Sequence, residues 1–200
     1  MDTVNELCLF LSRNTNKQII LLRDKQVLLW IFGITDFLND ITIPMKEREF
    51  LWGKSKLKLK RPDLNIKKQW TNKFGEHLCE EILLLLNKNI NKPSKKNKMQ
   101  LDIETEDWII EVKTGTYFTT GTALEKILGT PFKYAEIPKI FNKPLKIICI
   151  GGAEKKCIDV YKNIISKNQT TSKEKQKLVN CFKELDIEFL AASELLRLYI

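Results

Sequence analysis

The sequence contains a single histidine, His77, and its five cysteines never occur as Cys-x-x-Cys pairs. Zinc fingers and other metal sites that need several histidines or paired cysteines are therefore excluded. No Gly-x-Ser-x-Gly segment is present, and one histidine leaves little basis for a serine-hydrolase triad. No Gly-Lys-Ser/Thr follows the glycines of residues 115–129, so this segment is not a Walker loop that cradles nucleotide phosphates.

Long apolar runs are also missing. The longest, residues 27–34, is far shorter than the ~20 residues that a membrane span requires. The chain begins Met-Asp without a basic flank, which is not typical of a signal peptide. The odd number of cysteines, most of them among apolar neighbours, favours buried free thiols in a reducing compartment. We therefore expect a cytoplasmic, intracellular protein with no membrane partner.

The composition is that of a globular protein with an excess of positive charge. The chain has 200 residues, 43% hydrophobic and 30% charged, which suits a single domain with a substantial core. The net charge of +9 and the isoelectric point near 9.2 indicate a polyanionic partner, either nucleic acid or an anionic membrane surface. An AT-rich genome would also enrich lysine, so the position of the charge matters more than its sum.

Two segments concentrate the positive charge. Residues 54–73 carry eight basic side chains against one acid, Asp63, and every second residue from 54 to 60 is a lysine. A strand here would direct those ammonium groups to one side. Residues 87–100 are a predicted loop with five lysines and no acid. We interpret both segments as arms that contact phosphates, with a solvated linker as the alternative, and we select as DNA contacts Lys56, Lys58, Lys60, Lys95, Lys96 and Lys98.

Hydrophobic periodicity predicts the remaining elements. Residues 1–53 are expected to form a mostly helical N-terminal layer, and residues 70–191 the core. A helix over residues 75–86 would place Glu76 and Glu80 on a face separate from its leucines. The other predicted elements are helices over residues 4–12, 36–40, 123–128, 154–167, 173–185 and 192–200, and strands over residues 145–150 and 187–191.

Residues 99–114 read as two strands joined by a tight acidic turn. The alternation places Trp108, Ile110 and Val112 on one face of the second strand, and Ile109, Glu111 and Lys113 on the other. With the turn centred on residues 106–107, Asp102 pairs across from Glu111. Cross-strand Cβ atoms lie ~5 Å apart, so two carboxylates could share one cation. Five acids within ten residues (Asp102, Glu104, Glu106, Asp107 and Glu111) suit a hard divalent cation in an otherwise basic protein.

The acid-x-Lys tripeptide alone is not specific. A second copy, Glu154-Lys155-Lys156, follows two glycines and is interpreted as a solvated helix start. The first copy, Glu111-Val112-Lys113, lies on an apolar strand with Asp102 nine residues earlier. A surface hairpin with exposed charges is the alternative reading of the first copy.

After Lys113 the chain is rich in glycine and threonine and could approach a ligand backbone closely. The predicted helix over residues 123–128 should end at Gly129 and Pro131. The candidate DNA contacts in this part of the chain are Thr119, Thr120, Lys126, Lys133 and Tyr134.

The order of these features resembles the PD-(D/E)xK nuclease superfamily over about residues 70–191, and residues 119–138 are similar to a stretch of certain type II restriction endonucleases. The resemblance implies an α/β fold with a mixed sheet flanked by helices, Mg²⁺-dependent hydrolysis of DNA phosphodiesters, and a homodimer. Asp102 and Glu111 would be metal ligands, with the Val112 carbonyl nearby. Lys113 would orient or help deprotonate the attacking water, and Glu76, or alternatively Glu80, would be the acid contributed by a helix. Leu101 stands where the superfamily name has proline.

The expected activity is therefore a sequence-specific type II restriction-like endonuclease acting on double-stranded DNA. Two alternatives remain open. One is a structure-specific repair or recombination nuclease, such as a junction resolvase. The other is a basic DNA-binding module that has the fold but does not cleave.

Overall fold

The computed structural model describes residues 2–38, 40–64, 70–114, 123–161, 164–165 and 172–200. Its strands are β1 (Ile90–Asn91), β2 (Ile103–Thr105), β3 (Ile109–Lys113), β4 (Leu145–Cys149) and β5 (Ile187–Ala191). Its helices are α1 (Asp2–Arg13), α2 (Lys25–Ile31), α3 (Met45–Lys60), α4 (Trp70–Leu85), α5 (Ala123–Lys133), α6 (Ile137–Phe141), α7 (Gly152–Lys156), the π-helical turn η1 (Cys157–Tyr161), α8 (Lys173–Glu184) and α9 (Ala192–Arg197).

Within these ranges the strands form one mixed sheet in the order β1-β2-β3-β4-β5. The pairs β1–β2 and β2–β3 are antiparallel, and β3–β4 and β4–β5 are parallel. Parallel neighbours need a crossover connection, which α5 and α6 provide between β3 and β4, and α7 and α8 between β4 and β5. The predicted fold class, a mixed α/β sheet flanked by helices, is confirmed.

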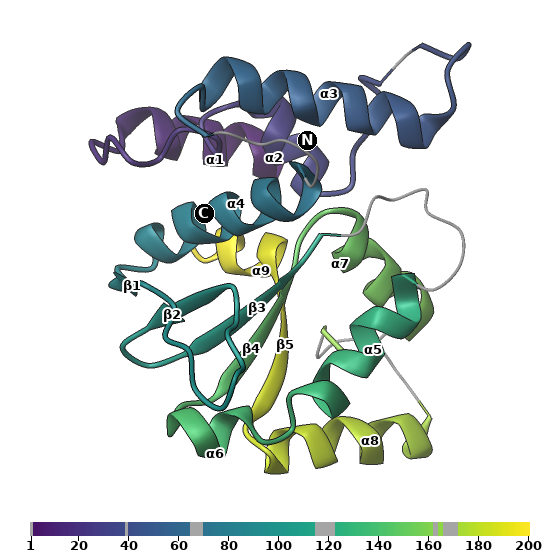
Figure 1. Ribbon diagram of the computed structural model, residues 1–200. Helices are drawn as coiled ribbons and strands as arrows, with labels where there is room; N and C mark the ends of the chain where they lie inside the picture. Colours follow the sequence, from purple (N-terminus) through teal and green to yellow (C-terminus); the bar gives the residue numbers. More distant parts are fainter. Residues whose placement is uncertain (1, 39, 65–69, 115–122, 162–163, 166–171) are drawn as a thin grey trace.

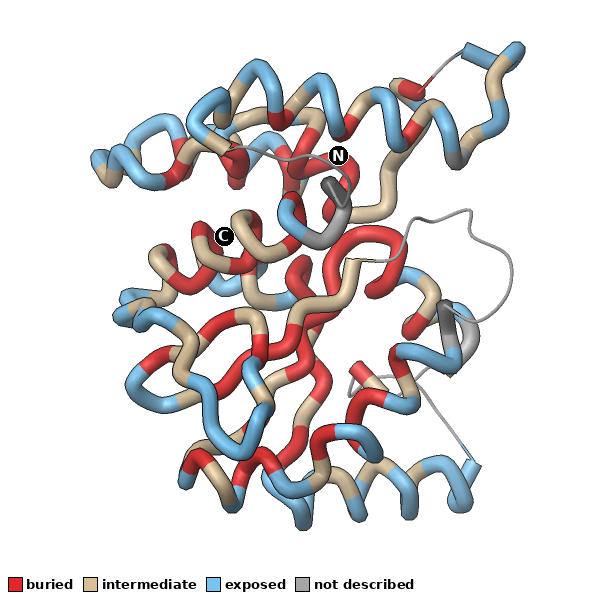
Figure 2. Tube along the Cα trace, viewed as in Figure 1, coloured by how far each residue is buried: buried red, intermediate tan, exposed pale blue. Residues whose placement is uncertain are grey.

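Helices cover both faces of this sheet (Figure 1). Helices α4 and α9 pack on one face, where Ile110 and Ile148 join the larger apolar cluster, and α1 and α2 add to it from outside α4. Helices α5, α6 and α8 lie on the other face, where Ile109 and Ile147 join the second cluster. Figure 2 shows that buried residues follow the strands, α2 and α4, whereas α8 has exposed and intermediate residues and no buried ones.

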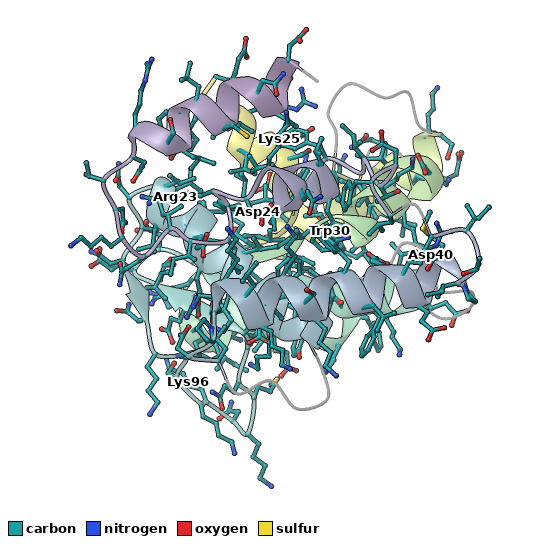
Figure 3. All side chains as sticks on the ribbon, turned by 90° about the horizontal axis from the view of Figure 1, so that it is seen from above. Arg23, Asp24, Lys25, Trp30, Asp40 and Lys96 are labelled. Atoms are coloured by element: carbon teal, nitrogen blue, oxygen red, sulfur yellow. The ribbon has the colours of Figure 1, made fainter. Side chains whose placement is uncertain are left out.

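The N-terminal layer is held to the core by buried polar contacts. The Glu81 carboxylate of α4 accepts hydrogen bonds from the backbone amides of Leu21 and Leu22, at 2.9 and 2.8 Å. Within the layer itself, the indole of Trp30 in α2 donates to the buried Glu49 carboxylate of α3 at 2.7 Å. Figure 3 shows Asp24 and Trp30 beside α3. The predicted helical character of this layer is correct, although residues 36–37 form a turn and not the expected short helix.

Helix α3 includes residues 54–60, where the alternation of lysines would suit a strand. Pro44 precedes the first helical residue, and its carbonyl accepts from the amides of Glu47 and Arg48. Leucine, lysine and glutamate are strong helix formers, and burial of Leu57 against the core fixes the helical face. Lysines two residues apart therefore point in different directions around α3, and not all to one side as they would in a strand.

Three other expectations are corrected. Helix α5 continues through Gly129 and Pro131 to Lys133, and the Thr130 hydroxyl donates to the Lys126 carbonyl in the turn that proline enters. Strand β1 lies inside the predicted loop at residues 87–100. The predicted helix at 154–167 is helical through Tyr161, as α7 followed by η1, but residues 164–165 form a turn. None of the described helices is both long and apolar enough to cross a membrane.

Candidate active site

The β2–β3 hairpin has the register that the sequence predicts. Ile103 pairs with Ile110 and Glu104 with Ile109, and the Thr105 amide donates to the Trp108 carbonyl across the turn. One step further along this register, Asp102 lies opposite Glu111. The apolar backing is confirmed by Ile103 and Ile110 in the larger cluster. Leu101 packs into the second cluster on the other face, so the alternation from one face to the other does not extend to this residue.

A backbone hydrogen bond fixes the Asp102 carboxylate. Its Oδ2 accepts from the Val112 amide at 2.8 Å. Asp102 lies just before the first residue of β2, and Val112 lies in β3. Ile109 donates its amide to the carbonyl of Pro144, just before β4, and the Lys113 carbonyl accepts from the amide of Ile150, just after β4. Val112 therefore directs its backbone groups to the other side of β3, toward β2. The Val112 carbonyl therefore lies on the side of β3 that faces β2, which is also the side of Asp102.

Glu111 and Lys113 meet on the face that carries the second cluster. Lys113 Nζ donates to Glu111 Oε1 at 2.7 Å, and the Glu111 side chain is buried. Burial raises the pKa of Glu111, the nearby Asp102 carboxylate raises it further, and the Lys113 ammonium opposes both effects. Two carboxylates held this close favour a bound cation.

The chemistry of these donors fits a hard divalent cation. Among the described residues, Asp102 Oδ1 and Glu111 Oε2 accept no hydrogen bond, so one oxygen of each carboxylate remains available. Mg²⁺ commonly takes one or two carboxylates together with water and substrate phosphate oxygens. No group of three or more histidine, cysteine, aspartate or glutamate side chains lies close enough to hold a metal within the described ranges. The protein therefore offers two carboxylates and the Val112 carbonyl, and the remaining ligands would be water and substrate.

The other acids of the hairpin are occupied elsewhere. Glu104 accepts hydrogen bonds from Ser94 and from Lys143 Nζ, the latter at 2.9 Å. Glu106 accepts from Asn89 at 2.9 Å, and Asp107 pairs with Lys88 at 2.5 Å. Of the five acids counted in the sequence, Asp102 and Glu111 are the two that the structure brings together.

The two helix acids occupy different places. Gly75 lies against Thr114, the residue after β3, so α4 contacts the chain where Lys113 ends its strand. Glu76 follows Gly75, and its carboxylate is paired with Lys73. Glu80 accepts from His77 at 2.8 Å.

Glu80 also lines a polar cavity of about 630 Å³ beside the α1–α2 connection. Arg61 and Asp63 line the same cavity. Of the two helix acids, Glu76 is the one that directly follows the residue of α4 in contact with the chain after β3.

Helix α5 brings a second lysine toward the carboxylates. The Lys133 ammonium is close enough to Asp102 and Glu111 to act on both electrostatically, and it donates to the Tyr134 hydroxyl at 2.8 Å. The sequence named Lys133 as a DNA contact, but it gave no signal that this lysine would face residues more than twenty positions earlier. Lys126 is exposed on the same helix, whereas Tyr134 is buried.

The other predicted DNA contacts differ in availability. Lys56 Nζ lies 2.8 Å and Lys60 Nζ 3.8 Å from Asp24 Oδ2, whereas Lys58 is exposed. In the turn between β1 and β2, Lys95, Lys96 and Lys98 are exposed, and Lys96 Nζ lies 4.9 Å from the Phe141 ring centre. Thr119 and Thr120 fall outside the described residues.

The second acid-x-Lys tripeptide is not the solvated helix start that the sequence suggests. Glu154 does lie in the first turn of α7, but its side chain is buried. Its Oε2 accepts from the Ser193 amide at 3.0 Å, and its Oε1 accepts from the Ser193 hydroxyl. Glu154 therefore ties α9 to the end of β4, because a buried carboxylate needs such partners.

Comparisons with known proteins give no relative. No protein-family model, no curated protein and no solved structure matches this chain. Support for a function therefore comes from the geometry of the chain itself.

Proposed function

We propose that the chain is a Mg²⁺-dependent endonuclease that hydrolyses phosphodiester bonds of double-stranded DNA, in the manner of a sequence-specific type II restriction enzyme. The observation that carries the proposal is the meeting of Asp102, Glu111 and Lys113 on the β2–β3 hairpin. Asp102 lies just before β2, whereas Glu111 and Lys113 lie in β3, and hydrogen bonds at 2.8 and 2.7 Å hold these side chains in place.

Each residue has a distinct part in this chemistry. Asp102 and Glu111, with the Val112 carbonyl, would hold the metal ion. The ion, when bound, would lower the pKa of a water ligand and withdraw charge from the phosphoryl oxygens. Lys113 Nζ, fixed by Glu111, would orient the attacking water and stabilise the charge that develops at phosphorus. An ammonium with an ordinary pKa is protonated at neutral pH, so positioning suits Lys113 better than service as a base.

The charge distribution supports a DNA substrate. The chain carries a net charge of +9, yet its two available carboxylates lie together in the hairpin. Exposed lysines on α3, α5 and the β1–β2 connection would contact backbone phosphates, whose counterions are released on binding. A protein that only bound DNA would not need the paired carboxylates, because they repel phosphate.

A homodimer is part of the proposal, since cutting both strands of a duplex calls for two sites related by a two-fold axis. The C-terminal residues divide into two groups. Leu196 is buried, and Tyr199 donates its hydroxyl to the Leu85 carbonyl, so both serve the fold of one chain. Leu198 and Ile200 are exposed and are the candidates for a dimer contact. A protein that sediments as a monomer both alone and on DNA would contradict this part of the proposal.

The experiment that tests the substrate class compares a long linear duplex, a four-way junction and a single strand, each with Mg²⁺ and with EDTA. The proposal expects Mg²⁺-dependent cutting of the linear duplex at defined positions. Cutting of the junction alone would favour a structure-specific nuclease. Salt-sensitive binding without any product would favour a non-catalytic DNA-binding module.

A further inference from the structure

Helix α5 packs directly over the face of the sheet that carries Glu111. Ile127 and Tyr134 of this helix are buried in the second apolar cluster together with Ile109, which lies on the same face of β3 as Glu111. The buried side of α5 therefore fixes the height and rotation of the helix above the hairpin. Lys133, next to the buried Tyr134, is placed at the end of α5 that faces the carboxylates.

The Lys133 ammonium is positioned by Tyr134 and not by direct contact with either carboxylate. Its Nζ donates to the Tyr134 hydroxyl at 2.8 Å and lies 4.5 Å from the centre of the Tyr134 ring. It attracts Asp102 and Glu111 electrostatically. Among the described residues it forms a contact ion pair with neither carboxylate, whereas Lys113 does so with Glu111. A lysine that served only to tie α5 to the sheet would be expected to form a contact ion pair with one of the two carboxylates.

We propose that Lys133 is a second cationic group of the active site, which binds the scissile phosphate of DNA against the carboxylates of the β2–β3 hairpin. The proposal rests on the nuclease function proposed above and adds a residue on the substrate side of the site. It names the ligand of Lys133 as a phosphodiester, because a negative group placed between an ammonium and a cation-loaded carboxylate pair is attracted by both.

The charge count explains why a second lysine is useful. The charges of Asp102, Glu111, Lys113 and a divalent cation leave the site with one positive charge, which one phosphodiester cancels. Water that loses a proton to the solvent attacks phosphorus as hydroxide, and the pentacoordinate state gains a further negative charge. The P–O ester bond then breaks, and the leaving oxygen carries this charge until it takes up a proton from the solvent. Lys133 supplies the positive charge that this state lacks, where a preorganised ammonium stabilises the transition state more than the bound substrate.

Tyr134 acts as a positioning residue in this arrangement. Its ring is buried and its hydroxyl accepts from Lys133, so it limits the directions that the flexible lysine side chain can take. Loss of the hydroxyl should lower the rate of cleavage less than loss of the ammonium.

The test is single-turnover cleavage of the wild-type substrate at saturating protein, with Kd measured separately in Ca²⁺. Lys133→Met keeps the aliphatic stem and should cut on the order of 100-fold more slowly, with a Kd within about threefold of the parent. Lys133→Arg should recover most of the rate, and Tyr134→Phe should fall between them. Lys139→Met, an exposed lysine on α6, is the control and should cut at the parental rate.

A charge-neutral substrate gives the second measurement. Once the cut position is mapped, a duplex with a single methylphosphonate there removes the negative charge that Lys133 would bind. The parent should prefer the normal duplex in Ca²⁺, and this preference should shrink by about two- to threefold in Lys133→Met. Cleavage by Lys133→Met at the rate of the Lys139→Met control, or an unchanged preference, would overturn the inference while leaving the nuclease intact. A parent chain that does not cut DNA would instead overturn the proposed function.

Discussion

Asp102 Oδ2 accepts a hydrogen bond from the Val112 amide at 2.8 Å, which ties the residue before β2 to the strand that carries both Glu111 and Lys113. The hydrogen bond uses one carboxylate oxygen and leaves the other available. It therefore determines where a cation could be held, and it makes the hairpin register essential to the site.

The first prediction concerns the two carboxylates. Asp102→Asn keeps an oxygen that can accept from Val112, and Glu111→Gln keeps the size of the side chain, so both should fold. Each removes a charged ligand and should weaken Mn²⁺ or Ca²⁺ binding at least about 10-fold, as judged by calorimetry, and suppress cleavage. Glu106→Gln changes an exposed acid of the same hairpin and is the control. Unchanged metal binding in both site variants would contradict the metal assignment.

The second prediction uses two glycines in helices. A Cβ at Gly75 would lie 2.2 Å from Thr114 Cγ2, whereas a Cβ at Gly129 would meet nothing within 4 Å. Gly75→Ala should cost about 1–3 kcal/mol in the free energy of unfolding, because α4 must move away from the end of β3. Gly129→Ala should be neutral or stabilise by up to ~1 kcal/mol. Urea denaturation of both variants measures the difference, and equal effects would show that α4 does not contact β3 this closely.

The third prediction concerns Glu154. Burial raises its pKa from 4.5 to about 7, despite the hydrogen bonds from Ser193. The folded protein then binds this proton more tightly than the unfolded chain. The resulting stabilisation is complete below about pH 4.5 and is lost as the pH rises through about 7.

Glu154→Gln imitates the protonated group and should gain stability over the parent between pH 5 and pH 8, by on the order of 3 kcal/mol. Glu174→Gln, on the exposed surface of α8, should show no such trend. Chemical denaturation at several pH values makes the measurement. A constant difference between Glu154→Gln and the parent would mean that Glu154 is ionised across this range.

The fourth prediction separates the lysines of α3. Lys58 is exposed, so Lys58→Ala should weaken binding to all DNA sequences about equally and flatten the salt dependence by up to ~0.9 log unit. Lys56 is bound to Asp24, so Lys56→Ala should instead lower the free energy of unfolding by about 1–2 kcal/mol. Salt titrations of binding and urea denaturation distinguish the two effects. The idea of a DNA-contacting α3 fails if Lys58→Ala leaves affinity and salt slope unchanged.

The hairpin and the parallel strands could be predicted because their signals are local. Alternation over residues 103–112 fixes the register, since a slip of one residue would turn Ile110 away from the larger apolar cluster and Glu111 into it. The bounds that the sequence predicts for strand β5 are those of the structure, Ile187–Ala191. The pairing of Asp102 with Glu111 follows from the same register.

The remaining errors come from contacts between distant parts of the chain. Lysine and leucine alternate in α3 with the period of a strand, but burial of Leu57 and the strong helix propensity of these residues prevail. In the sequence Glu154 resembles the start of an exposed helix, but in the structure α9 places Ser193 beside its carboxylate. Lys133 approaches the carboxylates only because α5 runs past Gly129 and Pro131, which sequence rules treat as a helix end.

The most direct test of the central claim compares the parent with Lys113→Ala on phage-sized DNA in Mg²⁺, followed by sequencing of the fragment ends. The parent should give discrete fragments with defined ends, and Ca²⁺ in place of Mg²⁺ should allow binding without hydrolysis. Lys113→Ala should give no fragments while binding DNA normally. Lys146→Ala, which removes a lysine paired with Glu188 at 2.6 Å on another strand, should cut like the parent. Fragments from Lys113→Ala at the parental rate, or none from the parent itself, would contradict the account.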